Sequence, residues 1–170
     1  MKYAFLFCTL LLFFSYNYIG DFMNSKLEGV VIDPGHGGVD SGAVGSDLLE
    51  KDYNLQISRY MYDRLMELGI PVYLTRDSDI TLNSSDRTKK ALSFLGNDKN
   101  VVVISNHLNA GGGDGAEVIY ALRNNSQLSN LILNNIGNTG IDTRRIYQKR
   151  LPSNSIKDYY FMLMDVEKLR

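Results

Sequence analysis

The chain has two histidines, and each follows a short, apolar, β-branched run of strand length. His36 comes after residues 29–32, within Asp-Pro-Gly-His-Gly-Gly, and His107 comes after residues 101–105, within Ser-Asn-His-Leu-Asn. A neutral imidazole is a good metal ligand and a good general base. Because the carboxyl ends of parallel strands meet at one edge of a sheet, two such neighbouring strands would bring both histidines together.

Glu50 is the best candidate for a third ligand. It lies in Leu-Leu-Glu-Lys-Asp, just before an amphipathic segment at residues 52–68. Taken alone, a glutamate at this position is more typical of a solvated helix start, where the helix dipole stabilises it. With His36 and His107, however, it completes a set of two imidazoles and one carboxylate. That set matches a catalytic zinc site whose fourth position is open to water.

Alternating strands and helices must position these residues. The apolar pattern predicts strands over residues 29–32, 70–75, 101–105 and 116–122, and helices over residues 52–68, 87–95 and 126–136. Pro34 is expected to end the first strand and Gly69 the first helix, and Ser84 or Ser85 to cap the second helix. The alternation predicts an α/β fold, a three-layer sandwich with a mostly parallel sheet flanked by helices.

Four short motifs resemble, in order, those of the zinc-dependent N-acetylmuramoyl-L-alanine amidases, which are bacterial peptidoglycan hydrolases. They are Asp-Pro-Gly-His-Gly-Gly, Leu-Glu-Lys-Asp, Thr-Arg-Asp and Ser-Asn-His-Leu-Asn-Ala, beginning at residues 33, 49, 75 and 105. The resemblance implies that His36, Glu50 and His107 bind Zn²⁺. It also implies hydrolysis of the amide bond between N-acetylmuramoyl residues and L-alanine in peptidoglycan. Asn106 departs from the isoleucine usual in the family, a change that concerns local packing rather than ligation.

The resemblance further implies a catalytic glutamate in a strand beyond the Lys-Asp-Tyr-Tyr segment at 157–160. The chain ends at Arg170 without such a strand, so we expect a domain truncated at its carboxyl end, lacking its last strand and helix. Glu117 and Glu167 are the only substitutes, both in weak contexts. Because general acid–base help contributes about 10²–10⁴-fold, we expect little amidase activity. The alternatives are a catalytically inactive, zinc-containing peptidoglycan-binding domain and a metal-free structural domain.

Several cations accompany these motifs. We interpret Arg76 and Arg87 first as structural ion-pair formers, with contact to a substrate carboxylate as the minority alternative. A basic cluster near the carboxyl end is interpreted as a solvated charged face, although it could also contact an acidic glycan; it comprises Arg144, Arg145, Lys149 and Arg150.

Composition and the amino terminus bound the cellular context. Residues 1–22 place one early lysine before an apolar run, which indicates a signal peptide or an N-terminal membrane anchor; a start at Met23 is the alternative. Residues 23–170 would then form the amidase domain of an exported protein in the bacterial cell envelope or outside the cell. One cysteine excludes a disulfide framework. A net charge of -1 gives no electrostatic case for nucleic acid, so we expect peptidoglycan as the partner, and a membrane if residues 1–22 anchor the chain.

Overall fold

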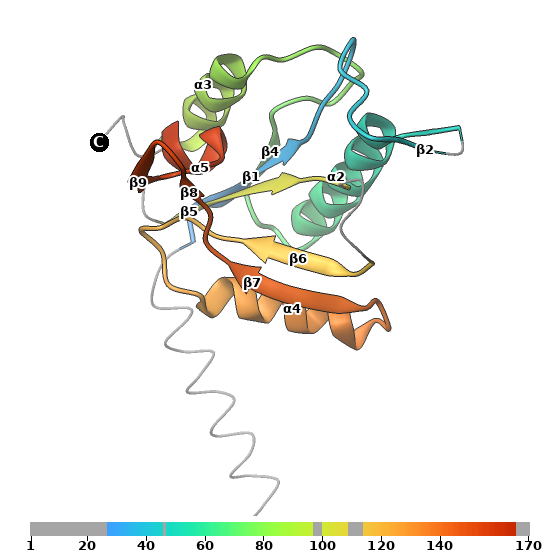
Figure 1. The fold of residues 1–170 in the computed structure, drawn as a ribbon. Helices are drawn as coiled ribbons and strands as arrows, with labels where there is room; N and C mark the ends of the chain where they lie inside the picture. Colours follow the sequence, from blue (N-terminus) through green and yellow to red (C-terminus); the bar gives the residue numbers. More distant parts are fainter. Residues whose placement is uncertain (1–26, 46, 97–99, 109–113, 166–170) are drawn as a thin grey trace, which may run out of the picture.

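A computed structural model describes residues 27–45, 47–96, 100–108 and 114–165. Its central sheet has three parallel strands in the order β4-β1-β5, which are Val72–Leu74, Gly29–Pro34 and Val101–Asn106 (Figure 1). β1 pairs with β5 along its whole length, and its last residue, Pro34, lies opposite Asn106. The carboxyl ends of these two strands are therefore side by side, as the sequence predicted.

Helices cover both faces of this sheet; they are α2 (Glu50–Glu67), α3 (Ser84–Leu95) and α5 (Phe161–Asp165) (Figure 1). α2 packs against the face that carries Val30 and Ile32, whereas α3 and α5 pack against the face that carries Val31. Successive side chains of a strand point to opposite faces, so β1 contributes to both apolar cores. Every residue of β1 is buried, which is typical of a parallel strand covered on both sides. The predicted α/β sandwich is confirmed.

Smaller elements surround the central sheet (Figure 1). The parallel pair β6 and β7 is joined by α4, and these elements span Ala116–Ile119, Thr143–Tyr147 and Gln127–Asn138. Two antiparallel pairs are β2 with β3 and β8 with β9, which span Val44–Gly45, Leu48–Leu49, Arg150–Leu151 and Asn154–Asp158. The β2–β3 pair leads into α2, and the β8–β9 pair leads into α5, so each pair connects to a helix of the sandwich.

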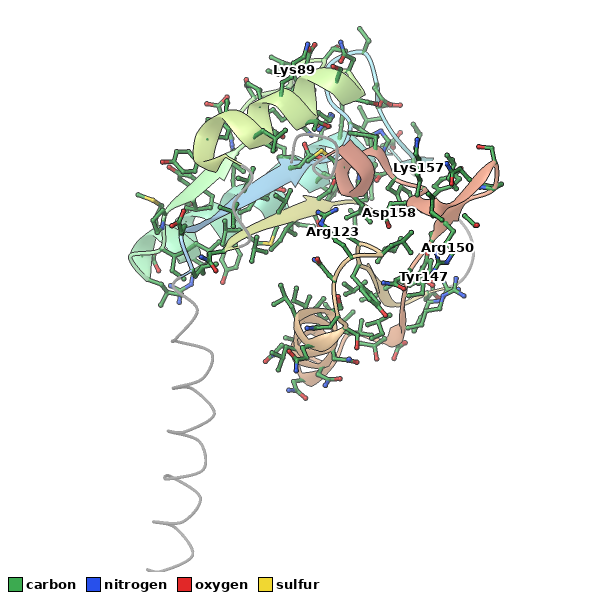
Figure 2. The ribbon with its side chains drawn as sticks, turned by 90° about the vertical axis from the view of Figure 1, so that its left-hand side faces the viewer. Lys89, Arg123, Tyr147, Arg150, Lys157 and Asp158 are labelled. Carbon is green, nitrogen blue, oxygen red and sulfur yellow. The ribbon has the colours of Figure 1, made fainter. Side chains whose placement is uncertain are left out.

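Two polar contacts connect the segment after β6 to the carboxyl-terminal elements (Figure 2). The carboxylate of Asp158, which is fully buried, accepts a hydrogen bond from the main-chain N–H of Leu122 at 3.0 Å. The guanidinium of Arg123 donates to the carbonyl of Leu163 at 2.6 Å. A buried carboxylate needs such partners because desolvation is otherwise costly. These contacts position β9 and α5, and hence Phe161, over the central sheet.

The helix boundaries near the site differ little from those that the sequence predicts, and the start of α2 determines where Glu50 lies. α2 begins at Glu50, two residues earlier than the apolar pattern predicted, so this carboxylate is in the first helical turn. The predicted end at Gly69 is confirmed, because Gly69 adopts a left-handed φ of 71° just after the helix. The segment at 157–163, expected as a strand or a helix start, contains the end of β9 and the start of α5.

The predicted signal peptide or anchor at residues 1–22 lies outside the described residues, and the division of the chain at residue 23 stays a prediction. Among the helices that the structure describes, none combines the length and the apolarity needed to span a bilayer.

Asn83, rather than Ser84 or Ser85, caps α3. Its side-chain carbonyl accepts a hydrogen bond from the main-chain N–H of Asp86 at 2.9 Å, and both serines lie inside the helix. The prediction of a serine cap was wrong because the helix starts three residues earlier than expected, and Asn is as good a capping residue as Ser.

We therefore expect Asn83→Ala to lower the free energy of unfolding by about 1 kcal/mol, since one N–H of the first turn loses its acceptor. Urea denaturation followed by circular dichroism measures this loss. Ser85→Ala, an exposed position in the same turn, is the matched control and should change the free energy little. Equal losses in the two variants would contradict the assignment of the cap.

Candidate metal centre

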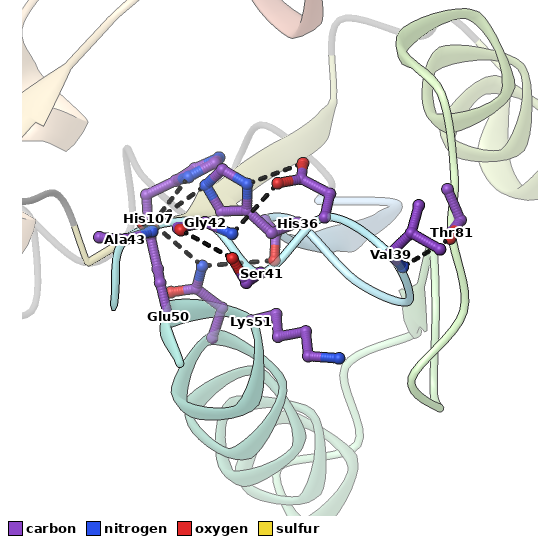
Figure 3. A network of polar contacts seen from close by, with 12 residues as sticks. His36, Val39, Ser41, Gly42, Ala43, Glu50, Lys51, Thr81 and His107 are labelled. Atoms are coloured by element: carbon purple, nitrogen blue, oxygen red, sulfur yellow. Dashed lines mark hydrogen bonds and ion pairs between the residues drawn. The ribbon is translucent and has the colours of Figure 1, made fainter. Parts of the chain in front are cut away.

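The structure brings the three predicted ligands together at the carboxyl ends of β1 and β5. His36 lies two residues beyond β1, His107 follows β5 directly, and Glu50 is the first residue of α2. One potential ligand atom from each residue lies within 4.8 Å of the other two. Figure 3 shows both imidazoles beside the Glu50 carboxylate. The role of these residues as metal ligands stays a prediction.

Both imidazoles direct a ring nitrogen at the same oxygen atom of Glu50. Oε1 of Glu50 lies 3.1 Å from Nδ1 of His107 and 3.3 Å from Nε2 of His36. The two imidazole rings meet edge to face, with centroids 4.9 Å apart and an interplanar angle of 85°. Each histidine therefore presents a ring nitrogen to the same point from a different direction.

Main-chain N–H groups hold the Glu50 carboxylate in place. Oε2 accepts from Ala43, and Oε1 accepts from Leu108, both at 2.9 Å, while Asn54 donates to Oε1 at 3.3 Å. Burial of the side chain tends to raise the pKa of Glu50, but the hydrogen bonds from Ala43 and Asn54 and the nearby His36 outweigh burial. The pKa of Glu50 is thus below its ordinary value, and the carboxylate is ionised at neutral pH although it is 4% exposed.

Asp40 orients His36, a role that the sequence analysis missed. Its Oδ2 lies 2.9 Å from Nδ1 of His36, and this hydrogen bond lowers the pKa of Asp40, against the opposing effect of burial. Because an ionised carboxylate can only accept, Nδ1 is the donating nitrogen, and in the neutral ring Nε2 turns its lone pair toward Glu50. The signal in the sequence was a carboxylate four residues after the histidine, across a glycine turn that Gly37 and Asp40 close by hydrogen bonds.

The donor set fits Zn²⁺. In this tautomer Nε2 of His36 and Oε1 of Glu50, 3.3 Å apart, are both electron-pair donors that a single cation could bind. Burial, followed by the neighbouring His36, lowers the pKa of His107, which favours the neutral ring that metals require. Two imidazoles and one carboxylate are also ligand types that zinc accepts in catalytic sites. The residues present are thus suited to hold the ion that the sequence predicts.

Buried Arg87 holds the loop that carries His36. It forms the expected ion pair, with Nη1 at 2.9 Å from Oδ1 of Asp33, and it also donates to the carbonyls of Pro34 and His36. His36 adopts a left-handed φ of 59°, uncommon for a residue with a side chain. A residue in this conformation persists where its surroundings fix it. Here the hydrogen bond from Arg87 to the carbonyl of His36 fixes the backbone. The interpretation of Arg87 as an ion-pair former is confirmed.

Arg76 differs from the expectation. None of the salt bridges found among the described residues includes it. Its guanidinium donates instead to main-chain carbonyls, among them those of Pro34 and Gly35. The prediction of an ion pair was wrong for Arg76 because the partners are main-chain atoms, which a pattern of side chains does not reveal.

Of the two nominated catalytic carboxylates, the structure describes only Glu117. Glu117, in β6, pairs with Arg145 at 3.0 Å and with Arg144 at 3.3 Å, and both arginines belong to β7. It is not among the residues that line the cavity beside the histidines, so its nomination gains no support. Glu167 lies outside the described residues.

Asn106, the departure from the family pattern, faces α2. Its Nδ2 lies 3.4 Å from the carbonyl oxygen of Asn54, so the asparagine makes a polar contact between β5 and the helix. His107 follows it and lies in the cluster with His36 and Glu50.

Comparison with known proteins now identifies the family. Residues 30–163 match the profile of the Amidase_3 family, described as N-acetylmuramoyl-L-alanine amidase. The chain belongs to this family. The germination-specific N-acetylmuramoyl-L-alanine amidase of Bacillus subtilis (strain 168) is 36% identical over 91 residues, which cover 48% of the chain and 38% of that relative. The endolysin of Bacillus phage SPP1 is 33% identical over 151 residues, which cover 86% of the chain and 50% of that relative.

A solved structure extends this relationship to the fold. The catalytic domain of CwlV, an N-acetylmuramoyl-L-alanine amidase from Bacillus(Paenibacillus) polymyxa var.colistinus, superposes with a TM-score of 0.66 at 29% identity, covering 80% of the chain and 73% of that domain. The resemblance inferred from the four motifs is therefore confirmed at the level of family and fold. The chain spans half or less of the length of the two curated relatives.

Gly35 has no side chain, and the imidazole of His107 occupies the space that a Cβ at this position would need. A Cβ on Gly35 would lie 2.3 Å from Cε1 of His107, so Gly35→Ala should displace the ring and lower the free energy of unfolding by about 1–3 kcal/mol, as for other overpacked sites. Urea denaturation measures the stability, and NMR of the two imidazoles reports the displacement.

Gly45→Ala is the matched control, since a Cβ there meets nothing within 4 Å. It should leave both imidazole signals in place. A Gly35→Ala protein with unchanged histidine signals would contradict the close approach of His107 to the loop.

Proposed function

We propose that this chain binds Zn²⁺ through His36, Glu50 and His107 and hydrolyses the amide bond between N-acetylmuramoyl residues and L-alanine in peptidoglycan. The observation that carries the proposal is the convergence of these three side chains at the sheet edge. Family membership supplies the reaction class, and the names of the relatives, which include a germination-specific N-acetylmuramoyl-L-alanine amidase, support the substrate.

The residues of the site have distinct tasks in this proposal. A bound Zn²⁺ would supply a Lewis acid for the amide carbonyl and would acidify a water molecule. His36, Glu50 and His107 bind the ion, and Asp40 keeps the Nε2 lone pair of His36 directed at it. The N–H groups of Ala43 and Leu108, together with Asn54, fix the Glu50 carboxylate, as metal-ligating carboxylates usually require.

A cavity next to the histidines offers space for the substrate. It has a volume of about 270 Å³, and both His36 and His107 line it. Leu82 and Phe161 contribute apolar surface, while Asn83 contributes polar groups. Apolar walls with a few polar groups are typical of small-molecule sites, and they suit the short methyl side chain and the amides at the start of the stem peptide.

The cellular context follows from the substrate. Peptidoglycan lies outside the bacterial cytoplasm, so we propose that the protein acts in the cell envelope or outside the cell. Residues 1–22 would serve as its signal peptide or membrane anchor, and residues 23–170 as its amidase domain. We propose peptidoglycan, and not nucleic acid, as the macromolecular partner, since the net charge of -1 provides no general attraction to polyanions.

The test is release of soluble fragments from dye-labelled peptidoglycan, with new amino-terminal L-alanine counted in the same samples. We expect zinc-dependent release that stops on chelation and resumes when Zn²⁺ is added. Glu50→Gln should lose zinc affinity by more than the roughly 10–100-fold typical of outer-shell partners, and should lose release with it. Glu67→Gln, at the exposed end of the same helix, should behave like the unaltered protein.

Two results would contradict the proposal. Zinc-dependent binding to cell walls without new amino-terminal L-alanine would instead support the inactive binding domain. Equilibrium dialysis that finds no bound Zn²⁺ would instead support the metal-free structural domain. Release that is zinc-dependent but slow would agree with the expectation that the chain has little activity.

A further inference from the structure

Arg76 is a buried cation that binds main-chain oxygen atoms. Only 1% of the surface of Arg76 is exposed. Its guanidinium carries five N–H groups that can donate hydrogen bonds. The carbonyl acceptors and their distances are Pro34 at 3.1 Å, Gly35 at 2.9 Å, Lys51 at 2.8 Å and Ser78 at 3.1 Å. Most of its hydrogen-bonding capacity is therefore used within the protein, which leaves little for a substrate.

The acceptors belong to the segments that carry two of the candidate ligands. Pro34 and Gly35 lead directly into His36, and Lys51 follows Glu50 in the first turn of α2. A single Nη2 atom donates to both Gly35 and Lys51. Because the guanidinium is planar and rigid, it fixes the spacing between the histidine loop and the start of the helix.

The environment of Arg76 combines an unfavourable burial with specific main-chain contacts. Burial lowers the pKa of Arg76 more than any other influence, followed by repulsion from Arg87. Burial of a cation without a carboxylate partner is costly, and the four main-chain carbonyls that accept from the guanidinium offset this cost. The loop also accommodates the arginine, since a Cβ on Gly37 would lie 2.9 Å from its Nε.

We propose that Arg76 is a positioning residue of the candidate metal centre, which sets the separation of His36 and Glu50 by holding the carbonyls of Gly35 and Lys51. The inference rests on the proposed function, because it assumes that Zn²⁺ binds to these ligands. Arg76 acts through the backbone and does not touch the ion. Its loss should therefore change how well the ligands fit the metal, as well as how stably the chain folds.

The experiment compares Arg76→Met, Arg76→Lys and Arg59→Met in the full chain. Zinc affinity is measured by competition with a chromophoric chelator, well below the melting temperature of each metal-free variant. We expect Arg76→Met to weaken zinc binding about 10–100-fold, as for other residues that orient ligands. Arg76→Lys should show a smaller loss, because an ammonium group with three N–H donors reaches fewer of the carbonyls.

Arg59→Met is the matched control. Arg59 is an exposed arginine of α2 that donates to the carbonyl of Asp77, in the loop that also contains Ser78. The substitution removes the same kind of bond between the same helix and the same loop, but it does not touch the residues next to His36 or Glu50. Zinc affinity should stay within about twofold of the unaltered protein, below the loss expected of a ligand-orienting residue.

The results separate the possibilities. Lower zinc affinity in a folded Arg76→Met or Arg76→Lys protein, with Arg59→Met unaffected, supports the positioning role. A lower melting temperature with unchanged zinc affinity overturns it, because Arg76 is then purely structural, and failure of both Arg76 variants to fold has the same meaning. Absence of zinc binding by the unaltered protein rejects the proposed function itself, which distinguishes that failure from failure of the inference.

Discussion

The carboxylate of Asp33, at the end of β1 and 1% exposed, is the contact on which the arrangement of the strand ends depends. One oxygen accepts from Thr75, just beyond β4, at 2.5 Å and from Arg87 of α3 at 2.9 Å; the other accepts from Ser105 of β5 at 2.8 Å. A single anion thus connects all three strands and a covering helix. Because an unpaired buried carboxylate is very unfavourable, the strands are held in one relative position, and the histidines that follow two of them have one relative position as well.

The charges around the candidate metal centre are arranged with negative groups on one side of the histidine loop and positive groups on the other. Anionic Glu50 faces the imidazoles, whereas cationic Arg87 and Arg76 lie behind the loop and bind its carbonyl oxygens. The main-chain dipoles of that loop therefore point their negative ends toward the arginines. Because Arg87 donates to the carbonyl of His36, that group is satisfied while the backbone turns through the left-handed conformation at this residue.

Much of this could be predicted from the sequence, because the relevant information lies in local patterns. Apolar, β-branched runs identified β1 and β5, and the histidine after each run indicated the sheet edge where the cluster lies. What the sequence could not reveal are contacts made through main-chain atoms or across long separations. The hydrogen bonds from Arg76 to carbonyls and the N–H groups that hold Glu50 leave no mark in residue type. The cap at Asn83 was missed for a related reason, since several capping residues stood in a row and only the backbone distinguishes them.

The main-chain groups that hold Glu50 allow the residues around it to be substituted without loss of these hydrogen bonds. Two of the groups that fix its carboxylate are N–H groups of Ala43 and Leu108, which every residue except proline possesses. Natural drift or deliberate redesign can therefore exchange the side chains at these two positions while the carboxylate keeps its anchors. Both positions border the cluster, and Leu108 is 44% exposed. The rim of the site can thus acquire a new shape independently of the centre that it surrounds.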